Sequence, residues 1–203
     1  MSVRKKTAIL ISGNGSNMAA LVAAAQAPDY PAEIALVICN VPGAGGIARA
    51  QSLGVPVKVI SHKEFDSREN FDTAVDAALR DAQIELICEA GFMRIHSAWF
   101  AERWEGRILN IHPSLLPAFP GIRVHEQVLA AGEKESGCTV HFLTPELDSG
   151  PIVLQAKVPV LPGDTKESLA ARVQIEEHKI YPEALKLVAS GNVSLKDGKA
   201  IFV

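Results

Sequence analysis

The feature that most constrains the fold is an alternation of short β-branched runs with alanine-rich segments in the first half of the chain. The alanine-rich segments have the apolar period of helices, whereas the β-branched runs have the length of strands. Strands that alternate with helices predict a parallel sheet on which the helices pack. The expected order is strand 7–12, helix 18–27, strand 34–40, helix 47–53, strand 55–60, helix 71–80 and strand 84–89.

The predicted strands are apolar on both faces, as residues 8–11 and 36–39 show. Continuous apolar runs of this kind are typical of strands that helices cover on both sides. The sequence therefore predicts an α/β fold, with a Rossmann-like, mostly parallel twisted sheet and helices on both of its faces.

The second half of the chain predicts further strands, two helices and a terminal hairpin. The expected elements are strand 107–112, a proline-rich loop 113–121, helix 124–131, strands 138–143 and 152–160, helix 166–189 and a hairpin that pairs 193–195 with 200–203. Asp164 stands three residues before Glu167, and these two residues form a candidate capping pair for the long helix. Because neither a repeat nor a linker interrupts its 203 residues, the chain is expected to form one domain, 1–203.

Charge and composition argue against several classes of partner. The net charge is -3, and the lysines and arginines are scattered, so we expect no nucleic acid and no anionic membrane as partner. The start, 1–6, is basic, but the apolar stretch 7–11 is too short for a signal peptide, and no later run has the length of a membrane span. Cys39, Cys88 and Cys138 lie far apart in apolar segments and are interpreted as reduced core residues of a cytoplasmic protein.

A glycine-rich turn, residues 12–17, lies between the first strand and the first helix. Glycines at such a turn let backbone N–H groups and a helix N-terminus converge on an anion. The dinucleotide fingerprint is not met, because Met18 stands at the third glycine position and Asn40 replaces the acid that closes the second strand. A site for a terminal phosphate, with Ser16 and Asn17, is one interpretation; a tight turn in which Asn14 or Ser16 only caps the helix is the other.

Two polar residues share one face of the strand 107–112. Asn110 and His112 are two positions apart, so they project to the same side while Leu109 and Ile111 project to the other. Pro113 is expected to end the strand, which places the pair at the carboxyl end, where open α/β sheets bind ligands. An amide and an imidazole there could bind an oxyanion and move a proton.

Asp148, in a turn before an apolar strand, is the best candidate for a carboxylate beside His112. A carboxylate at that position would favour the charged imidazole. The alternative is a buried histidine bonded to backbone and an aspartate that serves its own turn. His141 shares a strand face with Thr139 and is either a supporting or ligand-site residue or an ordinary strand histidine. The histidines show no zinc spacing, so no metal is expected.

Several motifs resemble the phosphoribosylglycinamide formyltransferase (glycinamide ribonucleotide transformylase) family of folate-dependent formyltransferases, over residues 9–188. The segment 109–117, closing with 119–121, is similar to the hallmark of folate formyltransferases in general. Narrower matches are 11–17, 90–94, 148–152 running on to Gln155, 172–174, 177–178 and 181–182.

The resemblance implies a formyltransferase fold and formyl transfer in purine (IMP) biosynthesis from 10-formyltetrahydrofolate to the amine of 5-phosphoribosylglycinamide, with no metal and no covalent enzyme intermediate. It also implies roles for named residues. Asn110 and His112 would polarise the formyl carbonyl, with Asp148 keeping the histidine charged. The phosphorylated substrate would be held by Gly15, Ser16, Asn17 and Glu177, and the folate by Arg68, Met93, Arg94, Ile95, His96, Asn110 and Thr144.

The family pattern places phosphate binding in the N-terminal half, and folate binding and catalysis in the C-terminal half. Two residues depart from it: His96 stands where an apolar residue is more usual, and Arg123 where a histidine is common. Both departures lie at the edge of the expected folate-binding site. A monomer or a homodimer is expected.

Three rival functions remain for this pattern of residues. Formyltetrahydrofolate deformylase and methionyl-tRNA formyltransferase share the Asn, His and Asp set, but both usually carry an additional domain, so the length of this chain argues against them. A catalytically silent nucleotide-binding module is the third, and it would leave Asn110 and His112 unexplained.

Overall fold

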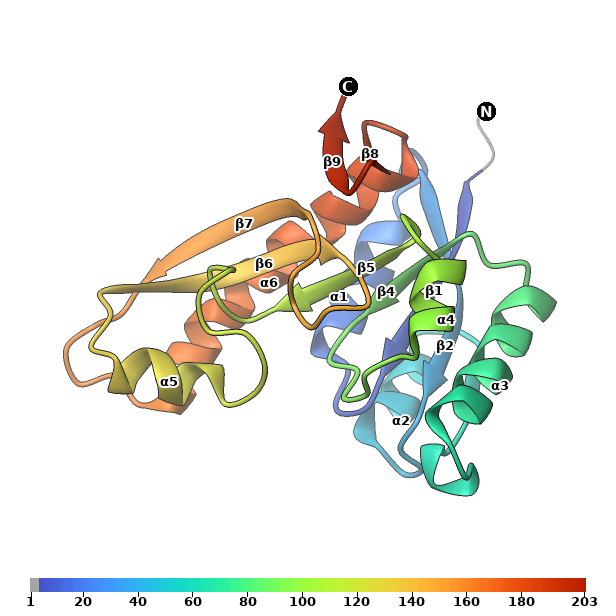
Figure 1. The fold of residues 1–203 in the computed structure, drawn as a ribbon, viewed down its shortest axis with the longest axis horizontal. Coiled ribbons are helices and arrows are strands. Elements are labelled where there is room, and N and C mark those ends of the chain that lie inside the picture. Colours follow the sequence, from blue (N-terminus) through green and yellow to red (C-terminus); the bar gives the residue numbers. More distant parts are fainter. Residues whose placement is uncertain (1–3) are drawn as a thin grey trace.

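Seven strands form one sheet in the computed structural model, which describes residues 4–203 (Figure 1). Their order is β3-β2-β1-β4-β5-β6-β7. The strands are β1 (Lys5–Ile11), β2 (Ala32–Cys39), β3 (Val57–Val59), β4 (Leu86–Glu89), β5 (Ile108–His112), β6 (Glu135–Phe142) and β7 (Ile152–Pro159). The prediction of a basic start, 1–6, falls partly on residues 1–3, which lie outside the described residues.

The sheet is parallel from β3 through β5 and antiparallel from β5 to β7. This arrangement confirms the predicted α/β fold with a mostly parallel sheet. β3 is shorter than the predicted strand 55–60 at both ends, and β4 begins two residues later than the predicted strand 84–89.

Helices cover both faces of the parallel strands (Figure 1). They are α1 (Ser16–Ala25), α2 (Gly45–Ser52), α3 (Arg68–Asp81), α4 (Ala98–Arg103) and α6 (Lys166–Ala189). α5 (Val124–Ala130) instead shares an apolar cluster with β6, β7 and α6. Residues of α1, α2 and α6 share one apolar cluster with β1, and residues of α3 and α4 share another. The sequence did not predict α4 or the short 3-10 helix η1 (His62–Glu64), because both are shorter than two helical turns.

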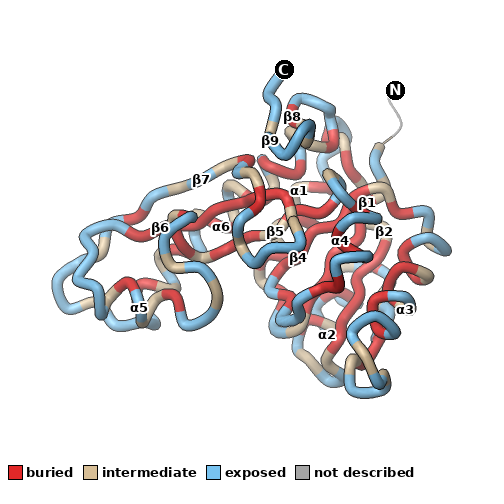
Figure 2. Tube along the Cα trace, in the orientation of Figure 1, coloured by how far each residue is buried: buried red, intermediate tan, exposed pale blue. Residues whose placement is uncertain are grey.

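The core follows the alternation of strand side chains. Ile9 and Ile11 of β1 belong to the cluster with α1 and α6, whereas Ala8 and Leu10 belong to the cluster with α3 and α4. Figure 2 shows the resulting buried layer along the central strands. The three cysteines are buried and free, as predicted for core residues.

The start of the long helix differs from the prediction. Thr165 is the N-cap of α6, and its side chain and that of Ser168 accept each other's backbone N–H groups. Asp164 and Glu167 therefore do not form the capping pair. Asp164 instead binds Arg172, with a 2.7 Å contact to the guanidinium. The predicted terminal hairpin is present as β8 (Val193–Lys196) and β9 (Lys199–Phe202).

Tyr181 ties α6 to the middle of the sheet. Its buried hydroxyl lies 3.0 Å from the carbonyl oxygen of Glu89 and 2.9 Å from that of Leu109. These carbonyls belong to the adjacent strands β4 and β5, so α6 is fixed directly beneath the strand ends that carry Glu89 and Asn110. Across residues 4–203, the helices are all too short or too polar to cross a membrane.

Candidate active site

The carboxyl ends of β4 and β5 open into a cavity of about 790 Å³. α3 and α4 cover the same face of the sheet farther back along the strands. Glu89, Asn110 and His112 line the cavity, while Leu109 and Ile111 point to the opposite face and join the cluster with α6. The predicted common face of Asn110 and His112 is thus confirmed.

Asn110 is held by a histidine on the neighbouring strand. The antiparallel register of β5 and β6 places Asn110 directly opposite His141, and the Asn110 Nδ2 lies 3.2 Å from His141 Nε2. His141 Nδ1 lies 2.9 Å from the carbonyl oxygen of Phe142 and must donate to it. Nε2 of a neutral His141 is therefore the acceptor, so the Asn110 amide donates one hydrogen to it and keeps the other for the cavity. His141 accordingly supports Asn110.

His112 and Asp148 come together across the cavity wall. His112 Nδ1 lies 3.4 Å from Asp148 Oδ2, and His112 Nε2 lies 2.8 Å from the carbonyl oxygen of Phe119, to which it donates. Both ring nitrogens thus face acceptors, an arrangement that suits the doubly protonated imidazolium. Both alternatives posed for this pair hold in part, because His112 bonds to backbone and also faces the carboxylate.

The position of Asp148 depends on two loops. Its backbone is left-handed, with φ 49°, and its Oδ2 accepts a 2.7 Å hydrogen bond from the backbone N–H of Gly121. Phe119 and Arg123 in the facing loop are left-handed as well. Non-glycine residues with positive φ are sparse and gather at functional sites, where surrounding contacts hold them.

Polar side chains of β6 and β7 hold the loop 113–121. Thr139 Oγ1 donates to the carbonyl oxygen of Ser114 and accepts the backbone N–H of Leu116. Gln155 Nε2 lies 2.9 Å from both Thr139 Oγ1 and the carbonyl oxygen of Leu116. Sequence reasoning assigned no role to Thr139, although its place opposite His112 in the β5–β6 pairing follows from the register.

Burial sets the charge of two other histidines. Burial lowers the pKa of His141, against opposing effects of its bond to Phe142 and of Asp148. Burial and the neighbouring His112 lower the pKa of His125. The cavity therefore favours neutral imidazoles at His141 and His125.

The glycine-rich turn leads into α1 without the predicted side-chain cap. Gly15 is the N-cap, in the left-handed conformation with φ 68°, and neither Asn14 nor Ser16 caps the helix. Asn17 Nδ2 donates to Glu177 Oε2 at 2.8 Å, and Gln174 Nε2 donates to Ser16 Oγ at 3.0 Å. The predicted group Gly15, Ser16, Asn17 and Glu177 thus assembles between α1 and α6.

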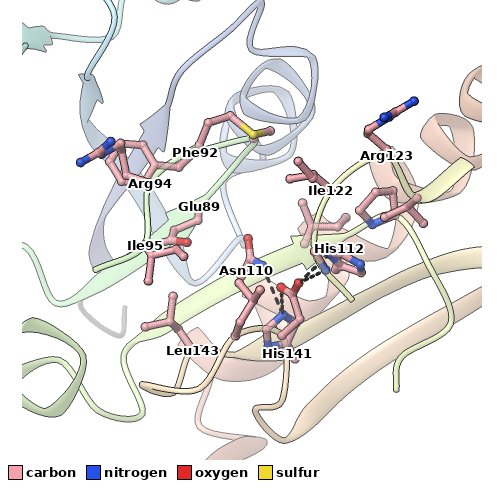
Figure 3. Close-up of a pocket in the computed structure, with 18 of the residues that line it drawn as sticks. Glu89, Phe92, Arg94, Ile95, Asn110, His112, Ile122, Arg123, His141 and Leu143 are labelled. Carbon is pink, nitrogen blue, oxygen red and sulfur yellow. Dashed lines mark hydrogen bonds and ion pairs between the residues drawn. The ribbon is translucent and has the colours of Figure 1, made fainter. Parts of the chain in front are cut away.

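The loop that follows β4 and the loop that follows β6 face each other across the cavity. Met93 and Ile95 are exposed to 71% and 51% and line it together with Arg94 and Thr144. Figure 3 shows Asn110, His112 and His141 close together, with Arg94 and Ile95 on one side and Ile122 and Arg123 on the other. Exposed apolar side chains around a polar floor are typical of small-molecule sites.

Arg68 and His96 lie differently from the other predicted folate residues. Arg68 is exposed at the start of α3 and is not among the residues that line the cavity. His96 borders the cavity, but its side chain is only 1% exposed and contacts Asp72 and Glu89. The His96 side chain therefore points into the protein interior. Sequence reasoning missed Glu89, although a charged residue that closes an apolar strand could have drawn attention.

Comparisons with known proteins show what the chain is similar to. The model of the family described as Formyl transferase matches residues 5–185. The chain is 50% identical over 196 residues to the trifunctional purine biosynthetic protein adenosine-3 of Gallus gallus. The aligned region covers 97% of this chain and 20% of that protein. It is 42% identical over 192 residues to the phosphoribosylglycinamide formyltransferase of Escherichia coli (strain K12). Here the aligned region covers 95% of this chain and 91% of the relative.

A solved structure shares the whole fold. The glycinamide ribonucleotide transformylase 1 from Symbiobacterium toebii superposes with a TM-score of 0.96 and 41% identity, covering 100% of this chain and 96% of that one. This likeness confirms the predicted formyltransferase fold. The chain spans about a fifth of the length of the trifunctional relative and most of the length of the single-function relative.

The tautomer of His141 provides a first test. Because burial lowers its pKa below the usual 6.5, His141 should be neutral at pH 7, with the proton on Nδ1. The stability gained by burying this neutral ring is present above pH 6.5 and is lost as the pH falls through the folded pKa. Nitrogen-15 NMR of the imidazoles measures the pKa of His141 and the nitrogen that carries its proton, and the His141→Gln variant assigns the signals. A pKa of His141 above the usual 6.5, or a proton on Nε2 of the neutral ring, would contradict the arrangement.

Proposed function

The chain belongs to the formyl transferase family, and on that premise we propose that it transfers the formyl group of 10-formyltetrahydrofolate to the amine of 5-phosphoribosylglycinamide. The products are 5-phosphoribosyl-N-formylglycinamide and tetrahydrofolate, in de novo purine biosynthesis. One observation carries the proposal: Asn110, His112 and Asp148 converge in a cavity whose neighbouring turn, with Asn17 and Glu177, has the groups to hold a second, phosphorylated substrate.

The reaction needs two kinds of help from the protein. The amine nitrogen attacks the formyl carbon, the carbonyl oxygen gains negative charge, and the folate nitrogen leaves with a proton while the attacking nitrogen loses one. The free hydrogen of the Asn110 amide and the Nε2 proton of His112, released from the Phe119 carbonyl, would stabilise that oxygen. His112 would then give this proton to the leaving nitrogen and take up the proton that the attacking nitrogen loses. Preorganised donors of this kind are typically worth about 3–4 kcal/mol each in the transition state.

Asp148 would support His112 rather than react. Its carboxylate faces His112 Nδ1 at 3.4 Å and stabilises the imidazolium. The nucleophile arrives with the substrate, so the proposed reaction needs no serine or cysteine nucleophile and forms no covalent enzyme intermediate. It also assigns no step to a metal.

The two substrates would meet at the strand ends. Gly15, Ser16 and Asn17 would receive the phosphate at the start of α1, where backbone N–H groups attract anions. Glu177, whose pKa burial raises, accepts from Asn17 and would take the ribose hydroxyls or the amine as donors. Folate would lie along Met93, Arg94, Ile95 and Thr144 in the cavity.

Arg68 remains proposed for the carboxylate tail of the folate, outside the cavity. We also propose a cytoplasmic location, which the free and buried state of the three cysteines supports. The expectation of a monomer or homodimer remains open.

A product assay tests the proposed reaction directly. Tetrahydrofolate should form only when both 10-formyltetrahydrofolate and glycinamide ribonucleotide are present, in a one-to-one ratio to formylated ribonucleotide. Absorbance measures tetrahydrofolate, and chromatography measures the formylated ribonucleotide. Folate product without ribonucleotide would mean hydrolysis, and absence of product in both reactions would mean a silent module, so either result would refute the proposal.

Asp148→Asn should lower kcat by about 10²–10⁴-fold, because an amide cannot stabilise the imidazolium that moves the proton. The binding of the phosphorylated substrate should change little. Steady-state kinetics with each substrate varied measure both effects. Asp76→Asn is the matched control: this buried carboxylate binds Arg80, Arg103 and Trp104 away from the cavity, so its loss should lower stability but not kcat. An unchanged kcat in Asp148→Asn would remove Asp148 from the mechanism.

Ser16→Ala should raise the KM of glycinamide ribonucleotide by about tenfold or more, because hydrogen bonds to charged groups are stronger than neutral ones. Its kcat and the KM of the folate should stay close to the wild-type values. The unphosphorylated glycinamide riboside is the control substrate, and its KM should not change. An equal loss with both substrates would disprove the assignment of the phosphate to this turn.

A further inference from the structure

A second group of buried ionisable side chains lies behind the cavity wall, outside the proposed catalytic set. His96 Nδ1 lies 2.7 Å from Asp72 Oδ1, and His96 Nε2 lies 2.8 Å from Glu89 Oε1. The Nε2 contact has the distance of a close ion pair but not the direction of a hydrogen bond. The side chains are 1%, 1% and 5% exposed for His96, Asp72 and Glu89. We refer to these three residues as the buried charge cluster.

Aromatic rings enclose the imidazole of His96. Phe92 and Phe100 stack on it from the two sides, with ring centroids at 5.3 and 4.2 Å and planes within 17° of parallel. Such stacking suits a cation, because the faces of aromatic rings carry partial negative charge. Within the described residues, Asp72 from α3 and Glu89 from β4 are the charged groups that act on the ring.

The buried charge cluster joins three elements around the loop 91–95. Asp72 accepts both the imidazole of His96 and the backbone N–H of Ser97, the latter at 2.6 Å. At the other end of the loop, Ser12 Oγ accepts the backbone N–H of Met93 at 2.8 Å, and Ser12 donates its own N–H to the carbonyl of Gly91. Both ends of the loop are therefore fixed, and its exposed middle lines the cavity.

The charges are costly to bury unless they compensate one another. Burial lowers the pKa of His96, but the Glu89 and Asp72 carboxylates outweigh that effect and raise it to about 9. An imidazolium between two carboxylates is thus the stable form at neutral pH. Apolar side chains of similar size would fill this space without that requirement, and buried ion pairs add little stability by themselves. The cluster therefore calls for a role beyond packing.

We propose that Asp72, His96 and Glu89 act as one positioning unit, which fixes the loop 91–95 against the pterin end of the folate donor. The inference rests on the proposed function, since it assigns this side of the cavity to folate. Glu89 also lies beside Asn110 in the β4–β5 register, so His96 neutralises a carboxylate next to a proposed catalytic residue. His96 is a positioning residue in this account, because it acts through the loop and through Glu89.

Paired substitutions test the positioning role. The probe is 5-formyltetrahydrofolate, a stable isomer of the proposed donor, and calorimetry measures its binding. His96→Leu leaves the buried Glu89 carboxylate uncompensated and should weaken binding by about tenfold or more. Glu89→Leu/His96→Leu removes the uncompensated Glu89 charge and leaves Asp72 bonded to the Ser97 N–H, so it should recover part of the lost binding but stay about threefold or more weaker than wild type, because His96 no longer holds the loop; Glu89→Leu completes the cycle. Additive effects, or wild-type binding by His96→Leu, would overturn the proposal.

The pH dependence separates charge from shape. The contribution of His96 is fully present below pH 6.5 and is lost as the pH rises through about 9. Probe binding by the wild type should therefore weaken across that upper range, whereas Glu89→Leu/His96→Leu should show no such change. Equal pH profiles for the two proteins would show that the charge of His96 does not position the loop.

A stability control and a kinetic split complete the test. Asp76→Asn removes another buried carboxylate of α3 and should lower the unfolding temperature without weakening probe binding. In His96→Leu, the folate KM should rise while the KM of the ribonucleotide stays near the wild-type value. Failure of the wild type to bind the probe or to transfer formyl would instead contradict the proposed function, so the two failures are distinguishable.

Discussion

The structure of the site depends on the pairing of β5 with a parallel strand on one side and an antiparallel strand on the other. The register sets Glu89 of β4, Asn110 of β5 and His141 of β6 side by side. Because side chains alternate along a strand, all three project to the face that α3 and α4 leave open. A register shift of one residue would turn Asn110 toward α6 and replace it with an apolar neighbour.

The antiparallel return also brings Asp148 to the site. β6 leads back along β5, and the loop between β6 and β7 then passes over the strand ends. Asp148 in this loop and Phe119 in the loop after β5 adopt left-handed backbones, which costs energy that the hydrogen bonds of Gly121 and His112 help to offset. Strand pairing and loop geometry together produce a donor set that no single segment contains.

The periodicity of the sequence predicted those features of the structure that depend on residues close together along the chain. It gave the order of the elements in the α/β fold, the two-faced apolar strands and the common face of Asn110 and His112. The closeness of Asp148 to His112 needed the loop between β6 and β7, because a spacing of 36 residues does not determine a contact. The interior orientation of His96 was also unpredictable, since its two partners lie on α3 and β4.

The loop after β4 connects the two halves of the site. Its first residues bond to Ser12, which opens the glycine-rich turn, and its last residues bond to α3 through the buried charge cluster. The proposed phosphate and folate regions thus share one short loop with fixed ends. Because the middle residues of the loop are exposed while its ends are anchored, substrates can contact it without moving its frame. Preorganisation of this kind keeps the reacting groups within the narrow range of distances that transfer between two bound substrates requires.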